Sequence, residues 1–265
     1  MKTLAALAHG TASDLRGVLF DLDDTLLTHG VLTRAAYGAL WDLSAAGLRL
    51  VAVTGRPSGW GELIVRQWPI AGAVTENGAV LLTKDGKGLA RFERCDEIER
   101  RSRRVRLAQL VEEVRTAVPE ARLADDVDAR RSDITWDIGE RVTMDSDRVD
   151  AIARVIVARG ARTTRSSVHI HATFDEDDKA SGSIEMLRRT FQEDAGSALA
   201  RYAFIGDSGN DAACFAAFRT TFGVANVARH LSRLSVPPAF VAQATMGEGF
   251  AEIAARILTL RPRLA

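Results

Sequence analysis

Four carboxylates and one hydroxyl occupy comparable positions in the sequence, each closely following a short apolar run. They are Asp21, Asp23, Thr54, Asp207 and Asp211. Each acid alone could cap a helix or a turn, which is a common role for Asp after a strand. Parallel strands, however, bring their carboxyl ends to one edge of a sheet, where ligands bind. Carboxylates gathered there repel one another and need a cation, and an all-oxygen donor set suits Mg²⁺.

A magnesium site built from acids indicates a phosphate substrate. Asp21 is a candidate nucleophile, because a carboxylate can form an aspartyl-phosphate. Asp23, two residues further on, could protonate the leaving oxygen and then activate water. A phosphoryl group in transfer carries negative charge on its equatorial oxygens. We expect Thr54, the amide of Gly55 and a lysine to supply the donors that this charge requires.

The elements that must position these residues alternate between buried strands and helices. Short apolar runs predict strands over 17–22, 48–53, 72–74, 202–205 and 222–224. Helical patterns predict helices over 33–46, 58–68, 179–191, 211–218 and 249–260. Such alternation is typical of βαβ units. The sequence therefore predicts an α/β fold with a doubly wound, Rossmann-like parallel sheet.

Between the two halves of this pattern the composition changes and becomes rich in Arg, Asp and Glu. Amphipathic patterns predict helices over 105–118 and 148–158, and alternating patterns predict half-solvated antiparallel strands over 134–138 and 167–171. We therefore predict a discontinuous core, 1–84 and 172–265, interrupted by an α+β domain over 85–171. Polar loops bracket this insertion and are plausible hinges.

Four segments together resemble the four motifs of the haloacid dehalogenase-like (HAD) phosphohydrolases, in order and in spacing. They are Asp21-Leu22-Asp23-Asp24-Thr25, Val53-Thr54-Gly55-Arg56, Lys179, and Gly206-Asp207-Ser208-Gly209-Asn210-Asp211. The inserted domain is similar to the large α/β cap of the Cof-type branch, which includes the mannosyl-3-phosphoglycerate phosphatases. Glu76-Asn77-Gly78-Ala79 also matches the stretch that precedes this cap. The resemblance implies a HAD core and a substrate-specificity cap.

The resemblance also implies a role for each matching residue. Asp21 would be the nucleophile and a Mg²⁺ ligand, and Asp23 the general acid and base, with its backbone carbonyl on the metal. Asp207 and Asp211 would complete the metal site. The phosphate and the rest of the substrate would meet Thr54, Gly55, Lys179, Asn210 and Arg56.

Two groups of residues in the insertion allow two interpretations each. One is an arginine cluster: Arg91, Arg94, Arg100, Arg101, Arg103, Arg104 and Arg106. Interleaved acids favour a solvated surface, but arginine forks could instead hold a second anionic group of the substrate. His169 and His171 lie two apart and face one side of a strand. They could be a metal pair, although structural or substrate-facing roles are favoured because no third His or Cys is near.

We expect a Mg²⁺-dependent phosphatase that hydrolyses a small phosphorylated metabolite through an aspartyl-phosphate. The substrate would be a sugar phosphate or a phosphoglycerate glycoside such as mannosyl-3-phosphoglycerate, and the arginine cluster favours the second. A phosphomutase of the same superfamily is an alternative. A non-enzymatic phospho-acceptor similar to a response-regulator receiver is another alternative. In receivers, however, the acid pair and the phosphorylated Asp lie on different strands, whereas Asp21 and Asp23 follow the same predicted strand.

Composition excludes several other classes of protein. Apolar residues are 46% and charged residues 26%, which is ordinary for a globular protein and excludes a disordered one. Lys and Arg total 35, as do Asp and Glu, so no net charge favours nucleic acid or an acidic membrane. Two cysteines fit a reducing cytoplasm. The apolar stretch within residues 1–14 is too short for a signal peptide, and we expect these residues to be an irregular N-terminal segment. The oligomeric state stays open.

Overall fold

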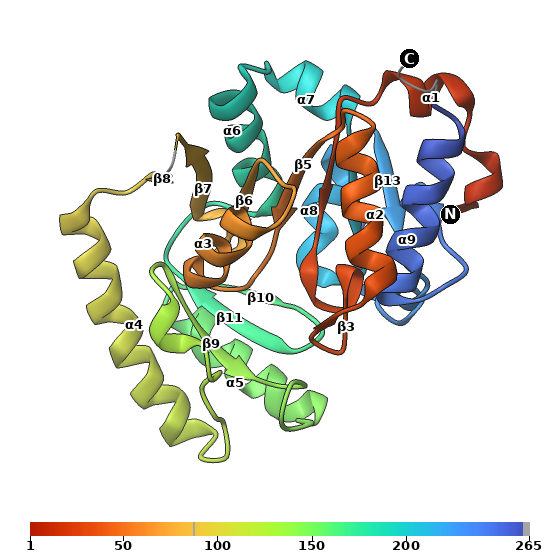
Figure 1. Ribbon diagram of the computed structural model, residues 1–265. Coiled ribbons are helices and arrows are strands. Elements are labelled where there is room, and N and C mark those ends of the chain that lie inside the picture. The colour runs from red at the N-terminus through yellow and green to blue at the C-terminus, as the bar shows by residue number, and fades with distance from the viewer. Residues whose placement is uncertain (87, 262–265) are drawn as a thin grey trace.

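The computed structural model describes residues 1–86 and 88–261, and a large twisted sheet runs through it (Figure 1). Its strands lie in the order β1-β14-β13-β12-β2-β5-β6-β7-β8. Their bounds are β1 (Lys2–Thr3), β14 (Phe240–Val241), β13 (Thr220–Gly223), β12 (Tyr202–Gly206), β2 (Gly17–Phe20), β5 (Arg49–Val53), β6 (Gly72–Thr75), β7 (Val80–Asp85) and β8 (Gly88–Glu93). Every pair from β1 to β6 is parallel, whereas β7 and β8 add an antiparallel edge. The predicted parallel core is confirmed.

Helices cover both faces of this sheet, because successive strand residues point to opposite sides. Phe20 packs into a cluster with helices α1 (His9–Asp14), α2 (Arg34–Ala45), α3 (Ser58–Gln67) and α9 (Met246–Thr259). Its neighbour Leu19 packs into a second cluster with α6 (Lys179–Phe191), α7 (Ala195–Arg201) and α8 (Ala212–Ala217). Strands buried on both faces explain the continuous apolar runs of the sequence. The doubly wound α/β fold is confirmed.

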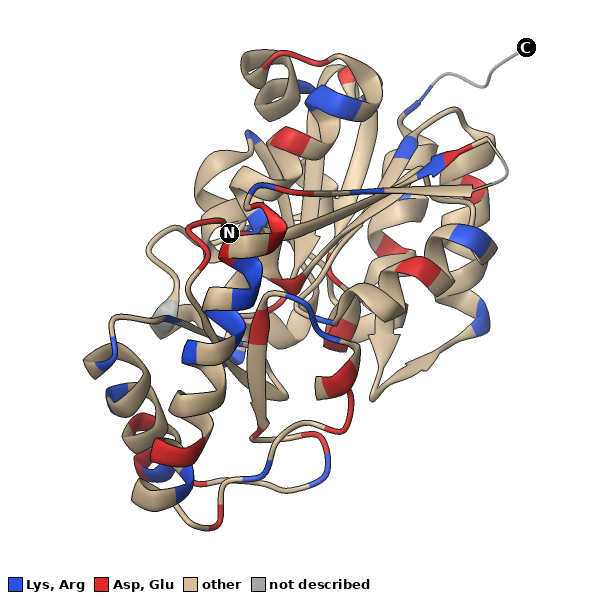
Figure 2. Cartoon of the chain, turned by 90° about the vertical axis from the view of Figure 1, so that its left-hand side faces the viewer, with Lys and Arg blue, Asp and Glu red and all other residues tan. Residues whose placement is uncertain are grey.

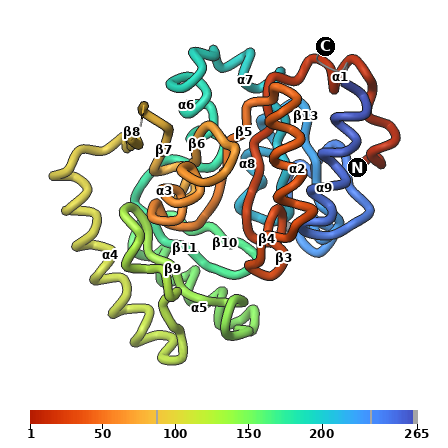
Figure 3. Tube along the Cα trace, in the orientation of Figure 1, coloured from red at the N-terminus to blue at the C-terminus, as the bar shows by residue number. Residues whose placement is uncertain are grey.

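A smaller unit, defined here as residues 97–173, has its own sheet and its own core. Three antiparallel strands lie in the order β10 (Arg162–Arg165), β11 (His169–Thr173) and β9 (Asp133–Asp137). Helices α4 (Glu97–Ala117) and α5 (Ser146–Ala158) cover one face, where Trp136 and Ile170 join a separate apolar cluster. The chain enters this unit after β8 and returns through β11 to α6 (Figure 3). These elements make up most of the predicted insertion, although β8 still belongs to the large sheet.

The prediction that strands of the smaller unit are half-solvated is wrong. All residues of β9 are buried, and so are His169 to Ala172 in β11. Their apolar side chains pack on α4 and α5. On the polar face, His171 lies against Gly55 and Asp133 is bound by Arg130, so protein and not water covers it. Alternation indicates that the two faces of a strand differ in polarity, but a polar face can also be covered by protein.

The N-terminus is more ordered than the sequence predicts. β1 pairs in parallel with β14, and Leu4, Leu7 and Ala12 are buried against the core. Strand β1 has only two residues, so no periodicity could reveal it. The sequence analysis also did not predict β7 and β8, the hairpin of β3 (Leu27–Thr28) and β4 (Val31–Leu32), or helix α7. No described helix has both the length and the apolar character to cross a membrane.

Candidate active site

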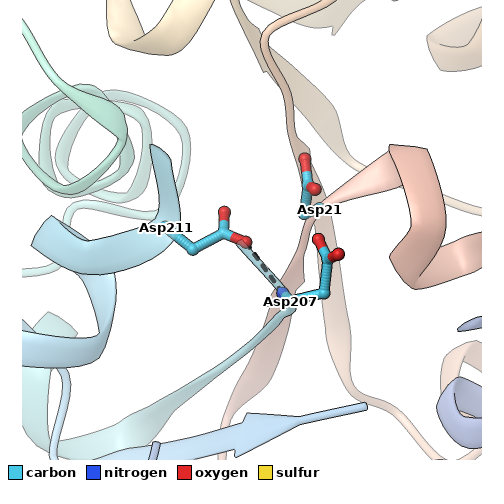
Figure 4. A group of neighbouring side chains, drawn as sticks. All are labelled: Asp21, Asp207 and Asp211. Atoms are coloured by element: carbon cyan, nitrogen blue, oxygen red, sulfur yellow. Dashed lines mark hydrogen bonds between the residues drawn. The ribbon is translucent and has the colours of Figure 1, made fainter. Parts of the chain in front are cut away.

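Three of the predicted acids meet where two neighbouring strands end (Figure 4). Asp21 directly follows β2, and Asp207 directly follows β12, which pairs with β2 in parallel. Asp211 ends the short turn Gly209–Asp211 that comes next. One carboxylate oxygen from each acid lies within 4.8 Å of the others, and all three side chains are buried. The expected convergence of Asp21, Asp207 and Asp211 is therefore present.

Lys179 brings the matching charge into the same place. It is the first residue of α6, whose start is fixed by a capping box between Asp178 and Ser181. Its Nζ atom donates to Oδ1 of Asp21 and to Oδ1 of Asp211, both at 2.7 Å, and its side chain is completely buried. Lys179 thus links the acid after β2 to the acid of the turn after β12.

Without a further cation, the electrostatics of this cluster disfavour ionisation of all three acids. Burial raises the pKa of Asp21 to about 8 although the Lys179 ammonium lowers it, and Asp211 and Asp23 raise it further. Burial and the neighbouring Asp211 and Asp21 also raise the pKa of Asp207 well above its usual range. One ammonium facing three buried carboxylates is too little positive charge. An all-oxygen donor set that lacks a cation fits a divalent metal such as Mg²⁺.

Asp207 and Asp211 are oriented by hydrogen bonds from the surrounding backbone and side chains. Asp211 accepts from the amides of Asp207 and Ser208 through Oδ2, at 2.9 and 3.1 Å. Asp207 accepts from the Thr25 hydroxyl at 3.2 Å and from the Asn226 amide at 2.8 Å. Each carboxylate is therefore held in one orientation before any ligand binds.

The carboxylate of Asp23 is bound by Arg56 and lies outside the group of three acids. The Arg56 guanidinium donates to both oxygens of Asp23, at 2.8 to 3.2 Å. The same guanidinium contacts Glu140 at 2.7 Å and Asp126 at 3.3 Å, both from the smaller unit. Arg56, expected at the substrate, thus connects the candidate general acid to the smaller unit.

The remaining predicted residues line the loops beside the acids. Thr54 is buried after β5, and its hydroxyl accepts from the Arg56 amide at 3.0 Å. Asn210 donates to Oδ1 of Asn77 at 3.1 Å. A Cβ built at Gly55 would lie 3.2 Å from the same Asn77 oxygen, so Gly55 and Asn210 both lie close to Asn77.

Several residues at this site were missed because they come from the smaller unit. Arg130, fully buried, donates to the Gly55 carbonyl at 2.9 Å and to both oxygens of Asp133 at 3.0 and 3.2 Å. Glu76 accepts from the amides of Ser132 and two other residues, so a side chain of the large sheet holds backbone of the smaller unit. No local pattern distinguishes Arg130 from the exposed arginines around it. Apart from Gly55, the sequence analysis had named only the Glu76-Asn77-Gly78 stretch here, because it matches the family segment that precedes the cap.

The arginine cluster is engaged with carboxylates. Arg100 and Arg103 bind Asp175, at 2.7 and 2.5 Å, and Arg100 also contacts Glu93. Basic and acidic segments accordingly lie interspersed in the smaller unit (Figure 2). This pairing matches the interpretation as a salt-bridged region, although Arg100 is buried and not solvated.

The two histidines each pair with a carboxylate of their own. His169 Nε2 lies 2.9 Å from Glu140, and His171 Nδ1 lies 2.9 Å from Asp133. Within the described residues, a group of three donors close enough for one metal occurs at the three acids and not at this pair.

Comparison with solved structures places the fold among the HAD hydrolases. No protein-family model matches the chain, and neither does any curated protein sequence. The Thermoplasma acidophilum protein 0175 is 18% identical with a TM-score of 0.70 over 93% of this chain and 99% of its own. The sucrose-phosphatase of Synechocystis, solved with sucrose and phosphate, is 14% identical with a TM-score of 0.63, over 92% and 98%. A subclass IIB sugar phosphatase of the HAD superfamily is 18% identical with a TM-score of 0.62, over 92% and 99%. The chain therefore has the HAD fold along nearly its whole length.

Proposed function

We propose that this protein is a Mg²⁺-dependent phosphatase that hydrolyses a small sugar phosphate. The observation that carries the proposal is the buried group of Asp21, Asp207 and Asp211 around Lys179, at the strand ends of a HAD fold. Similar structures include a sucrose-phosphatase and a sugar phosphatase, which favours a sugar phosphate as the substrate class.

In the proposed reaction, a carboxylate oxygen of Asp21 attacks phosphorus and the bond to the leaving oxygen breaks. Asp23 gives its proton to that oxygen, and then takes a proton from the water that hydrolyses the aspartyl-phosphate. Thr54, the Gly55 amide and Lys179 hold the equatorial oxygens in both steps. Mg²⁺, held by Asp21, Asp207, Asp211 and the Asp23 backbone, would neutralise the charge of the phosphoryl group and the acids.

The smaller unit would act as a cap that covers the leaving group and excludes water. Its contacts to Arg56 and Gly55 support this role. We propose residues 97–173 as the cap, since β8, within the predicted insertion 85–171, pairs in the large sheet. A phosphoglycerate glycoside is less well supported than a sugar phosphate. Two of the arginines that could hold its extra carboxylate, Arg100 and Arg103, are already paired with Asp175, and Arg100 also with Glu93.

Phosphate release tests this proposal directly. The purified chain is incubated with a panel of sugar phosphates in Mg²⁺, and separately with EDTA in excess. We expect repeated release of inorganic phosphate in Mg²⁺, loss of it in EDTA, and recovery when Mg²⁺ is restored. Full turnover in chelator would exclude the metal-dependent mechanism. An isomerised ester without free phosphate would indicate a phosphomutase, and a single stoichiometric phosphorylation would indicate a receiver-like module.

A further inference from the structure

Six buried side-chain polar atoms of the smaller unit have no hydrogen-bond partner among the described residues. Two of them, Nε2 of His171 and Oγ1 of Thr135, belong to neighbouring strands. His171 is 2% exposed and Thr135 is not exposed at all. The two residues are direct Cα partners across β11 and β9, so their side chains lie next to each other on one face of the sheet. Buried polar groups are nearly always satisfied, and this pair differs from the other such atoms because His171 also lies against Gly55 of the core.

The imidazole of His171 is held so that Nε2 is a hydrogen-bond acceptor. Its Nδ1 lies 2.9 Å from Asp133, whose two oxygens are in turn bound by the buried Arg130. An ionised carboxylate can only accept, so Nδ1 carries the proton and Nε2 keeps its lone pair. Burial lowers the pKa of His171 to about 4 against the opposing effect of Asp133, and the ring is therefore neutral at pH 7.

Nε2 of His171 lies against the loop at Gly55, which would bind the phosphoryl group. A Cβ built at Gly55 would be 3.1 Å from His171 Nε2. Arg130 holds the arrangement from the other side, because it donates to the Gly55 carbonyl as well as to Asp133. The candidate nucleophile Asp21 follows β2 and Lys179 begins α6, so both lie outside the smaller unit. The part of a substrate that meets the smaller unit is therefore the leaving group.

We infer that His171 and Thr135 form a subsite for one hydroxyl of the leaving group, on the carbon next to the phosphoester. This inference rests on the proposed phosphatase function. The substrate hydroxyl donates to His171 Nε2, and its oxygen accepts from the hydroxyl of Thr135. A substrate carboxylate in this subsite would face the lone pair of His171 Nε2. The Asp133 carboxylate lies on the other side of the imidazole, so the substrate carboxylate would be repelled. The subsite thus selects sugar and polyol phosphates over phosphoglycerate-type esters.

Matched substrate pairs test the subsite. The pairs are glucose 1-phosphate with 2-deoxyglucose 1-phosphate, and glycerol 1-phosphate with 3-hydroxypropyl phosphate, in which only the neighbouring hydroxyl differs. We expect the wild-type protein to show a kcat/KM roughly 5- to 100-fold higher for the hydroxylated member of a pair. In His171→Asn this ratio should fall close to one. The Asn amide can still donate to Asp133 but places nothing at the position of Nε2. His171→Gln, which reaches that position, should recover part of the ratio.

Two isosteric Thr→Val changes provide a matched control. Thr135→Val removes the second group of the subsite and should lower the ratio. Thr163 also has a buried hydroxyl without a partner among the described residues. It pairs with Ala172, on the face of the small sheet that packs against α4 and α5. Thr163→Val should therefore leave the ratio as it is in the wild-type protein.

The outcomes separate the inference from the function on which it rests. If the wild-type protein releases no phosphate in Mg²⁺ from these four esters or from the panel of sugar phosphates, the proposed function and the subsite both fail. If it hydrolyses them without preferring the hydroxylated member, only the subsite fails. A preference that survives in folded His171→Asn, or that falls equally in Thr135→Val and Thr163→Val, also overturns the subsite.

Discussion

The charge balance at the candidate site depends on a few buried residues. Lys179 lies between Asp21 and Asp211 at 2.7 Å from each, and Asp207 lies beside them without an ion pair to any cation of the described residues. Buried charges are tolerated when they are paired, and removal of one partner is costly. The arrangement therefore favours binding of a cation, and substitution of any one of these acids should affect the metal before it affects the fold.

Asp21→Asn keeps the shape of the side chain and removes the attacking charge. We expect turnover of a sugar phosphate to fall by several orders of magnitude while circular dichroism stays unchanged, because Lys179 keeps its bond to Asp211. Asp24→Asn is the matched control. Asp24 has a φ of 54°, which Asn also adopts readily, so most of the activity should remain. Equal activity in both variants would show that Asp21 is not the nucleophile.

His171 should make the stability of the folded chain depend on pH. Burial lowers its pKa from 6.5 to about 4 in the folded protein. Between these pH values the unfolded chain binds a proton that the folded chain does not, so stability falls as pH falls from 6.5 to 4. The loss is on the order of 3 kcal/mol. Urea unfolding at pH 7, 5.5 and 4 should show a smaller loss in His171→Asn than in the wild-type protein, and an identical loss would contradict the buried neutral ring.

Among the elements, the start of α6 matters most for the site because it carries Lys179. Gly78, with a φ of +113°, packs directly on this helix, and a Cβ at Gly182 would lie 2.6 Å from the Gly78 Cα. Only the absence of a side chain on α6 at this point allows the Glu76–Gly78 turn and the helix to approach so closely. We expect this contact to set how far Lys179 reaches toward Asp21.

Two Gly→Ala changes in helices should have opposite effects. Gly182→Ala forces the helix away from Gly78 and should destabilise the protein by about 1–3 kcal/mol, with reduced activity. Gly38→Ala in α2 meets nothing within 4 Å and should stabilise it by about 0.5–1 kcal/mol. Thermal unfolding and phosphate release measure both effects. A Gly182→Ala variant that is as stable and active as Gly38→Ala would show that the contact does not position Lys179.

At the scale of the whole molecule, buried polar contacts join the two units. Arg130 reaches the Gly55 carbonyl, Arg56 reaches Glu140, and Glu76 holds the backbone of Ser132. These contacts lie beside the candidate catalytic residues. If the proposed function is right, the contacts that hold the two units together would also complete the substrate site.

Excision of residues 96–174 separates phosphate chemistry from substrate choice. Cys95 and Asp175 line the same pocket, so a short Gly-Ser linker can join the ends and keep β8 in the sheet. We expect the shortened chain to remain Mg²⁺-dependent. Its kcat/KM should fall far more for a sugar phosphate than for p-nitrophenyl phosphate, because binding energy from the cap is lost. Circular dichroism establishes that the core is folded. A folded variant with the full-length preference would place specificity in the core.

Much of the fold and the group of three acids could be predicted from the sequence, because the relevant signals are local. An apolar run followed by an acid marks the end of a buried strand, as at Asp21 and Asp207, and β2 and β12 become neighbours through the general order of βαβ units. Short or mixed elements gave weaker signals. Strand β1 has two residues, and α4 begins at Glu97, eight residues before the predicted start, because its first turns are charged.

By itself, the sequence determined the α/β core, the acids at its strand ends and the lysine that joins them. Only the tertiary structure decided what covers the polar face of β9 and β11. Arg130 and Gly55 are 75 residues apart, and Arg56 and Glu140 are 84 apart. Alternation along a strand shows that its two faces differ, but not whether water or protein lies over the polar one. That depends on how the two units pack, and their packing creates the buried pair of His171 and Thr135.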